Sequence, residues 1–231
     1  MAEEYSITTI NRLARKVLRG LVRFIYLVLA RVRITGLENI PPEGPYIVVF
    51  NHVSLYDPPL VLGFWPKPLE PLGALELWNE PLISWVVRLY GGVAVDRTHY
   101  NRASVERIVS ALNSGAVVAM APEGRISYKP GMQRARAGIA FIAEKTRAPI
   151  LPVGVVGCTK DFLKNALRLK RPNVEMRIGS LFHLPPIQQG KEKRKVAYQR
   201  NADVAMAHIA RLLPPEYRGY YSDFLSVLEN A

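Results

Sequence analysis

Short apolar runs alternate with amphipathic stretches along most of the chain after residue 45. Apolar runs rich in β-branched residues predict strands at Tyr46–Phe50, Val93–Val95, Val117–Met120, Ile150–Val156 and Val174–Ile178. Helical spacing of apolar residues predicts helices at Pro59–Trp65, Pro81–Leu89, Arg102–Leu112, Arg134–Thr146 and Arg194–Leu213. The polar segment Gln188–Arg194 is expected to be a loop. This alternation indicates an α/β fold with a largely parallel sheet flanked by helices.

Residues 8–34 have a different pattern, in which basic and apolar positions share one helical period. The recurring cations are Arg12, Arg15, Lys16, Arg19 and Arg23. Steps of three and four place them on one helix face, beside a broad apolar face. The longest uncharged run, Phe24 to Ala30, is far shorter than the roughly 20 residues that a membrane-spanning helix needs. The pattern favours a helix lying on a membrane, with its cations on anionic headgroups; the alternative is an amphipathic helix packed on the domain.

The length and charge of the chain agree with an N-terminal amphipathic helix followed by one α/β domain. A chain of 231 residues with 49% hydrophobic residues suits one folded domain, and we expect a membrane-associating helix at 1–34 and an α/β domain at 35–231. The formal net charge of +12 implies an anionic partner, and residues 8–34 hold seven cations and no acid. The chain shows no recognition helix, zinc spacing or ribonucleoprotein motif, which argues against a nucleic-acid partner. The single cysteine, Cys158, excludes an intramolecular disulfide and is expected to be buried.

The most informative segment for chemistry follows the first predicted strand after residue 45. His52 and Asp57 stand five residues apart there, and Pro58 and Pro59 come next. On one continuous helix this spacing separates two side chains by about 140°, so they can meet only if the chain turns between them. A strand, a turn and a helix beginning near Pro58 supply that turn. Asp57 can then hold one ring nitrogen of His52 and leave the other as a general base.

Each member of this pair also has a structural explanation. An Asp before two prolines caps helices without taking part in chemistry, and a partly buried histidine is common in folded domains. A catalytic role for the pair is supported by the segments that follow it in the sequence.

Four segments resemble the signature blocks of the glycerolipid acyltransferase family, in the family's order. They are Asn51-His52-Val53-Ser54-Leu55-Tyr56-Asp57, Gly91-Gly92-Val93-Ala94-Val95-Asp96-Arg97, Ala121-Pro122-Glu123-Gly124-Arg125-Ile126-Ser127 and Ala148-Pro149-Ile150-Leu151-Pro152-Val153. The first block matches the family pattern of a His and an Asp that are separated by four residues. Two positions depart from the family pattern: Ala94 stands where an aromatic is usual, and Arg125 follows Gly124 directly, so that Ile126 takes the usual Arg place.

The resemblance implies roles for the remaining site residues. Arg97 is expected to bind an acceptor phosphate, the alternative being a surface arginine beside Asp96. Glu123 is expected to pair with Arg97 or Arg125 or to bind an acceptor hydroxyl; the alternative is a simple turn carboxylate. Gly124 permits close backbone approach. Arg125 and Ser127 are further candidates for phosphate binding, although Ser127 equally suits a helix cap.

The resemblance also implies a reaction. It is transfer of a fatty acyl group from acyl-coenzyme A or acyl-carrier protein to 1-acylglycerol 3-phosphate, giving phosphatidic acid in phospholipid biosynthesis. Alternatives are glycerol 3-phosphate, another lysophospholipid or an acylated amino acid as acceptor, or a non-catalytic membrane-binding protein. No cofactor beyond the acyl donor is expected, nor a metal site, because His99, His183 and His208 lack partners at ligand spacing. The expected location is the cytoplasmic face of the cell membrane, as a peripheral or monotopic protein.

Two further basic clusters are expected to be solvated surface charge. They comprise Lys160, Lys164, Arg168, Lys170 and Arg171, and Lys191, Lys193, Arg194 and Lys195. The alternative is contact with coenzyme A phosphates or an acidic carrier protein.

Overall fold

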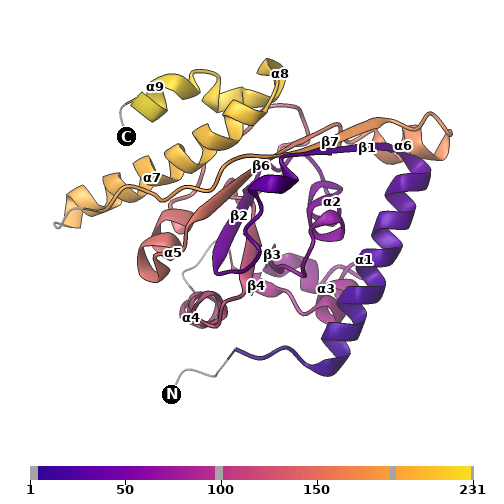
Figure 1. The fold of residues 1–231 in the computed structure, drawn as a ribbon, viewed down its shortest axis with the longest axis horizontal. Helices are drawn as coiled ribbons and strands as arrows, with labels where there is room; N and C mark the ends of the chain where they lie inside the picture. Colours follow the sequence, from indigo (N-terminus) through magenta and orange to yellow (C-terminus); the bar gives the residue numbers. More distant parts are fainter. Residues whose placement is uncertain (1–4, 97–100, 188–190, 230–231) are drawn as a thin grey trace.

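A twisted seven-stranded sheet forms the centre of the computed structural model, which describes residues 5–96, 101–187 and 191–229 (Figure 1). The strands are β1 (Arg31–Thr35), β2 (Tyr46–Phe50), β3 (Glu70–Ala74), β4 (Val93–Val95), β5 (Val117–Met120), β6 (Ile150–Val156) and β7 (Asn173–Ile178). Their order is β1-β7-β6-β2-β5-β3-β4, and every neighbouring pair is parallel except β6 and β7.

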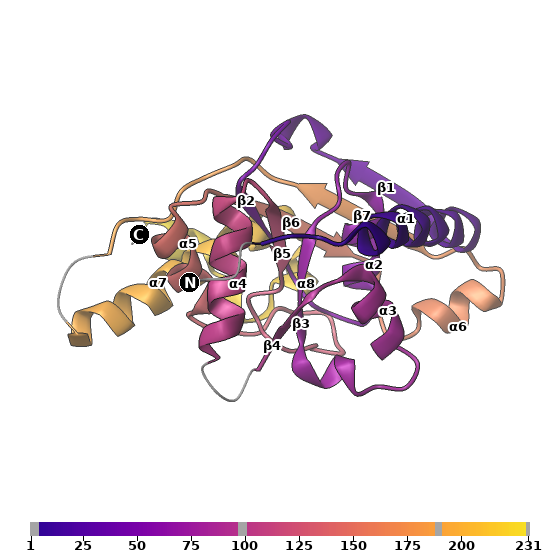
Figure 2. The same ribbon diagram turned by 90° about the horizontal axis from the view of Figure 1, so that it is seen from below.

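Helices cover both faces of the sheet (Figures 1 and 2). They are α1 (Thr9–Leu29), α2 (Asp57–Phe64), α3 (Ser84–Tyr90), α4 (Arg102–Asn113), α5 (Gly138–Thr146), α6 (Phe162–Leu167), α7 (Lys191–Leu212), α8 (Pro215–Arg218) and α9 (Phe224–Glu229). Helices α4, α5 and α7 pack on one face, and α1, α2 and α6 on the other. Ile47 and Val49 of β2 enter the first core, and Val48 and Phe50 enter the second. A central strand buried on both faces explains the uninterrupted apolar run in the sequence.

The α/β fold with a mostly parallel sheet is confirmed, and four of the five predicted strands have the predicted bounds. Strands β1 and β3 were not predicted. Strand β1 carries two arginines among its five residues, and β3 contains Pro71 and Gly73, so neither has a strand-like apolar pattern. The helix expected within residues 8–34 ends at Leu29, because the chain then enters β1 and pairs with β7. Helix α7 begins at Lys191, within the segment expected to be a loop.

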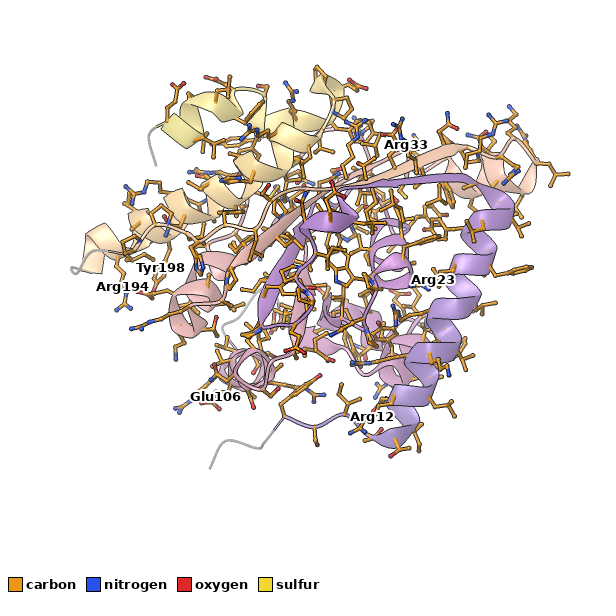
Figure 3. The ribbon with its side chains drawn as sticks, viewed as in Figure 1. Arg12, Arg23, Arg33, Glu106, Arg194 and Tyr198 are labelled. Atoms are coloured by element: carbon orange, nitrogen blue, oxygen red, sulfur yellow. The ribbon has the colours of Figure 1, made fainter. Side chains whose placement is uncertain are left out.

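The predicted orientation of the arginines on α1 is wrong. Arg15, Arg19 and Arg23 follow one another at steps of four and lie on the side of α1 that faces the protein; Figure 3 shows Arg23 on the side toward α2. Arg23 donates to the carbonyl of Gly63 at 2.5 Å and of Trp65 at 3.0 Å, and Arg19 donates to the carbonyls of Leu62 and Trp65. Two guanidinium groups thus satisfy carbonyls at the C-terminal end of α2, where cations are favourable.

Arg15 is more deeply buried than these two residues. It is 2% exposed and forms a two-pronged ion pair with Glu70 at the start of β3. Its Nε also donates to the carbonyl of Tyr90 at 2.7 Å, and Nη2 to that of Gly91 at 3.3 Å. The helix is therefore fixed to the domain by polar contacts as well as by packing of Val22 against Gly63.

The opposite face of α1 is apolar and exposed. Its large side chains are Ile10, Leu13, Val17, Leu21, Phe24, Ile25, Leu27 and Val28, which are 39–71% exposed. So many large exposed apolar side chains on one helix are typical of a surface that contacts another protein or a membrane. Within the described residues, none of the helices combines the length and the apolarity needed to cross a bilayer.

Candidate active site

The candidate site lies where β2 and β5 end, at one edge of the sheet. These strands are parallel neighbours, so the segments that follow them emerge side by side. His52 comes two residues after β2, and Glu123 three residues after β5. Sites in α/β sheets form at such carboxyl ends. The sheet therefore brings together two signature segments that are 71 residues apart.

His52 and Asp57 meet across a tight turn. The Nδ1 of His52 lies 3.1 Å from Oδ2 of Asp57, whose side chain is fully buried, whereas the His52 side chain is 16% exposed. The same Oδ2 accepts from the backbone amide of Ser54 at 2.7 Å. A carboxylate behind the ring holds the proton on Nδ1, which leaves Nε2 as the base.

Asp57 does not act as the side-chain cap of α2. The helix has no side-chain cap hydrogen bond, and the cap position is Tyr56. Asp57 lies instead in the first turn, where the helix dipole favours its charge. Burial raises the pKa of Asp57, while His52 and the Ser54 amide act in the opposite direction.

Asn51 fixes the start of this turn to the sheet. Its buried amide group donates to the carbonyl of Val155 on β6 at 2.9 Å and accepts from the Val155 amide at 2.7 Å. The side chain thus continues the β2–β6 pairing by one residue beyond the strand. The rings of His52 and Phe50 form a T-shaped pair with a centroid distance of 6.2 Å. The position of the imidazole is therefore set by the strand end on which it is carried.

Glu123 holds the backbone of His52. It is 2% exposed, its Oε1 accepts from the His52 amide at 2.8 Å, and its Oε2 accepts from the Gln133 amide at 2.7 Å. Burial raises the pKa of Glu123 to about 7, with the amides of Gln133 and His52 acting in the opposite direction. Both oxygens are thus used within the protein, and Glu123 has the contacts of a positioning residue.

The rest of the Glu123 segment runs alongside the His52 turn. The Ser127 amide donates to the His52 carbonyl at 3.0 Å, and the Tyr128 amide donates to the Val53 carbonyl at 3.0 Å. The Ser127 hydroxyl donates to the Lys129 carbonyl at 2.6 Å. Ser127 therefore contributes its backbone to the site, while its hydroxyl is used within its own loop.

Two arginines accompany Gly124. Arg125 is exposed, and its charge lowers the pKa of Glu123 against the effect of burial. Gly124 has φ +67°, and a Cβ there would lie 2.9 Å from Cδ of Arg136. The glycine thus allows the Arg136 side chain to lie over the turn, as well as the left-handed backbone. Arg136 was not predicted, because its place beside Gly124 depends on the path of the loop between them. Arg97 lies outside the described residues.

Comparisons with known proteins agree with this geometry. Residues 31–156 match the model of a protein family described as Acyltransferase. Among curated proteins, the chain is 24% identical over 159 residues to 1-acyl-sn-glycerol-3-phosphate acyltransferase from Borreliella burgdorferi, covering 68% of this chain and 64% of that protein. It is 28% identical over 179 residues to 1-acyl-sn-glycerol-3-phosphate acyltransferase alpha from Homo sapiens, covering 74% of this chain and 60% of that protein. The chain thus spans less than two thirds of the length of these relatives.

A solved structure is also similar to this fold. It is the 1-acyl-sn-glycerophosphate acyltransferase PlsC from Thermotoga maritima, with a TM-score of 0.60 and 25% sequence identity. The similarity covers 84% of this chain and 80% of that one.

Proposed function

The chain belongs to the Acyltransferase family, and on that premise we propose that it acylates the free hydroxyl of 1-acylglycerol 3-phosphate to give phosphatidic acid. The acyl donor is a thioester of coenzyme A or acyl-carrier protein. The acceptor is suggested by the substrate for which the relatives and the similar structure are named. The observation that carries the chemistry is the 3.1 Å contact between Nδ1 of His52 and a fully buried Asp57.

His52 acts as the general base in this proposal. Its Nε2 takes the proton of the acceptor hydroxyl while the oxygen attacks the thioester carbonyl carbon. Asp57 stabilises the imidazolium that forms. The tetrahedral intermediate then collapses, the carbon–sulfur bond breaks, and the thiolate leaves with the proton from His52. No nucleophile from the protein is required, because the acceptor supplies the attacking oxygen.

The acceptor phosphate needs cationic partners near this base. Arg125 and Arg136 flank Gly124 beside the Glu123 segment, and the family resemblance adds Arg97. Arginine suits this role because its planar group donates two parallel hydrogen bonds to a phosphate. Glu123 supports the site by fixing the His52 backbone, while Ser127 adds a backbone contact.

The acceptor is a membrane lipid, so the protein must reach a bilayer. We assign this contact to the exposed apolar face of α1, with Arg12 and Lys16 at its exposed edge. An apolar face entering the acyl region beside cations near the headgroups is the arrangement of an interfacial helix. Tyr26 of α1 donates to the carbonyl of Tyr56 in the catalytic turn at 2.6 Å, so this helix lies directly against the site.

One assay tests the proposal. Purified protein is given a labelled acyl thioester and a panel of acceptors, namely 1-acylglycerol 3-phosphate, glycerol 3-phosphate, other lysophospholipids and acylated amino acids. We expect transfer to 1-acylglycerol 3-phosphate, lowered at least about 100-fold in His52→Ala and unchanged in the matched control His183→Ala. Transfer to none of the phosphate-bearing acceptors overturns the substrate assignment. Full activity of both His52→Ala and Asp57→Asn overturns the mechanism.

A further inference from the structure

The corner between α6 and β7 combines exposed leucines with a dense group of cations. We name residues 160–171 the α6 corner. Leu163, Leu167 and Leu169 are 43%, 68% and 80% exposed. The cations are Lys160, Lys164, Arg168, Lys170 and Arg171, all exposed, and Asp161 is the one acid in the corner. A mixture of exposed apolar side chains and cations is typical of a surface that binds an anionic lipid bilayer.

The backbone of the corner turns one of these leucines outward. Helix α6 ends in a paired cap, with the Lys170 amide donating to the Asn165 carbonyl at 3.1 Å and the Leu169 amide to the Ala166 carbonyl at 2.9 Å. This cap places Leu169 at φ 56°, a left-handed position that helices usually give to glycine. A leucine is unfavourable there, and its side chain is largely exposed. Folding of the domain alone does not account for this leucine, which suggests a role in contact with another surface.

The corner is fixed to α1 and to the catalytic turn. Nη2 of Arg171 donates to the carbonyls of Leu27 at 2.9 Å and Ala30 at 3.3 Å, at the C-terminal end of α1. Phe162 stacks on Tyr26 at a centroid distance of 5.4 Å and lies 5.0 Å from the ring of Tyr56. Both views place α6 and α1 at the same end of the molecule (Figures 1 and 2).

We propose that the α6 corner is a second membrane contact, in which its cations bind the headgroups of anionic phospholipids and Leu167 and Leu169 enter the bilayer interface. This inference rests on the proposed function, because it takes a bilayer as the source of the acceptor. A single helix lying on a membrane leaves the domain free to rotate about the helix axis. A second contact beside Tyr56 fixes that rotation and holds the catalytic turn near the lipid surface.

Two features favour a bilayer over a protein partner. The corner lies at the same end of the molecule as α1 and is bonded to it through Arg171, so a surface as extended as a bilayer can reach both. Its five cations against one acid complement a surface of many phosphates.

Vesicle flotation tests the corner directly. One variant is Leu167→Ser/Leu169→Ser, and another is Lys164→Gln/Arg168→Gln/Lys170→Gln; Arg171 is kept because it holds α1. The matched controls are Leu225→Ser on α9 and Arg200→Gln on α7, which lie away from α6 (Figure 1). On phosphatidylcholine vesicles containing phosphatidylglycerol, we expect binding to fall roughly 10- to 100-fold in the cation variant and several-fold in the leucine variant. On vesicles of phosphatidylcholine alone, the leucine variant binds more weakly than the wild type and the cation variant does not.

Activity on two forms of the acceptor separates this inference from the proposed function. Both corner variants are expected to lose transfer to 1-acylglycerol 3-phosphate embedded in vesicles and to keep it with a short-chain acceptor dispersed as monomers. A wild-type protein without transferase activity refutes the proposed function, and flotation still decides the corner. Wild-type flotation by both corner variants overturns the inference. The inference is also overturned if the corner variants float like the wild type but lose self-association in gel filtration or lose binding to acyl-carrier protein.

Discussion

Asp57 combines complete burial with a single oxygen shared between His52 and the Ser54 amide. Replacement by Asn keeps the size of the side chain but removes the charge that stabilises an imidazolium. We expect Asp57→Asn to lower kcat about 100- to 10,000-fold with little change in KM. Steady-state kinetics at several acceptor concentrations measures this, with Asp223→Asn, at an exposed position before α9, as the control. A kcat within a few-fold of wild type contradicts the assigned role.

Glu123 makes the stability of the fold depend on pH. Its pKa rises from 4.5 in the unfolded chain to about 7 in the folded one, so the folded state binds the proton more tightly. Stability therefore falls as the pH rises from 4.5, and the loss is complete above about 7. A shift of this size corresponds to roughly 3 kcal/mol.

Urea unfolding between pH 4.5 and 8 measures this dependence. Glu123→Gln cannot ionise, so its free energy of unfolding should fall less over this range than that of the wild type. Burial also raises the pKa of Asp57. Because Asp57 is present in both proteins, the difference between the two pH slopes reports mainly on Glu123. Glu38→Gln on the surface should keep the wild-type slope. Parallel curves for wild type and Glu123→Gln contradict the pKa shift.

For individual residues of the site, the sequence predicted the contacts whose two partners are close along the chain. The five-residue spacing and the two prolines predicted the turn that joins His52 to Asp57. The use of Glu123 by the amides of His52 and Gln133 could not be predicted, because only the sheet brings these segments together. The same holds for Arg136 beside Gly124.

Among the elements, α1 shows what periodicity determines and what it leaves open. The spacing of the five basic residues from Arg12 to Arg23 correctly predicted a helix. The spacing did not predict which face of the helix packs against the rest of the protein. That choice depends on Glu70 and on carbonyls at the end of α2, which are distant in the sequence. The strands that were missed, β1 and β3, likewise depend on neighbours in the sheet and not on their own composition.

The buried pair of Arg15 and Glu70 should be the strongest polar link between α1 and the sheet. Arg15→Met leaves the Glu70 carboxylate buried without its counter-charge, and we expect a loss of about 3–5 kcal/mol in the free energy of unfolding. The double variant Arg15→Met/Glu70→Met should recover much of this loss. Arg12→Met, at an exposed position of the same helix, should change stability by less than about 0.5 kcal/mol. If Arg15→Met were as stable as Arg12→Met, the pair of Arg15 and Glu70 would contribute little to stability.

For the whole molecule, the exposed face of α1 should determine binding to membranes. Leu21→Ser/Phe24→Ser removes two large side chains from this face without touching the inward arginines. We expect several-fold weaker binding to anionic vesicles in flotation, with unchanged thermal unfolding. Deletion of residues 1–34 is a poorer test, because it removes most of β1 and uncovers Glu70. Unchanged flotation of the double variant would contradict the assignment of this face.

The inward arginines of α1 also have a consequence for the order in which the protein is made. Their partners lie between Leu62 and Gly91, and β1 pairs with β7, the last strand of the sheet. At a synthesis rate of about 5–20 residues per second, α1 leaves the ribosome several seconds before these partners. During that interval its guanidinium groups are without these carbonyls, and water or lipid phosphates take their place as acceptors. If α1 binds a membrane as proposed, we expect the nascent chain to reach the membrane before it folds, with the arginines exchanging phosphate for carbonyl oxygens as translation proceeds.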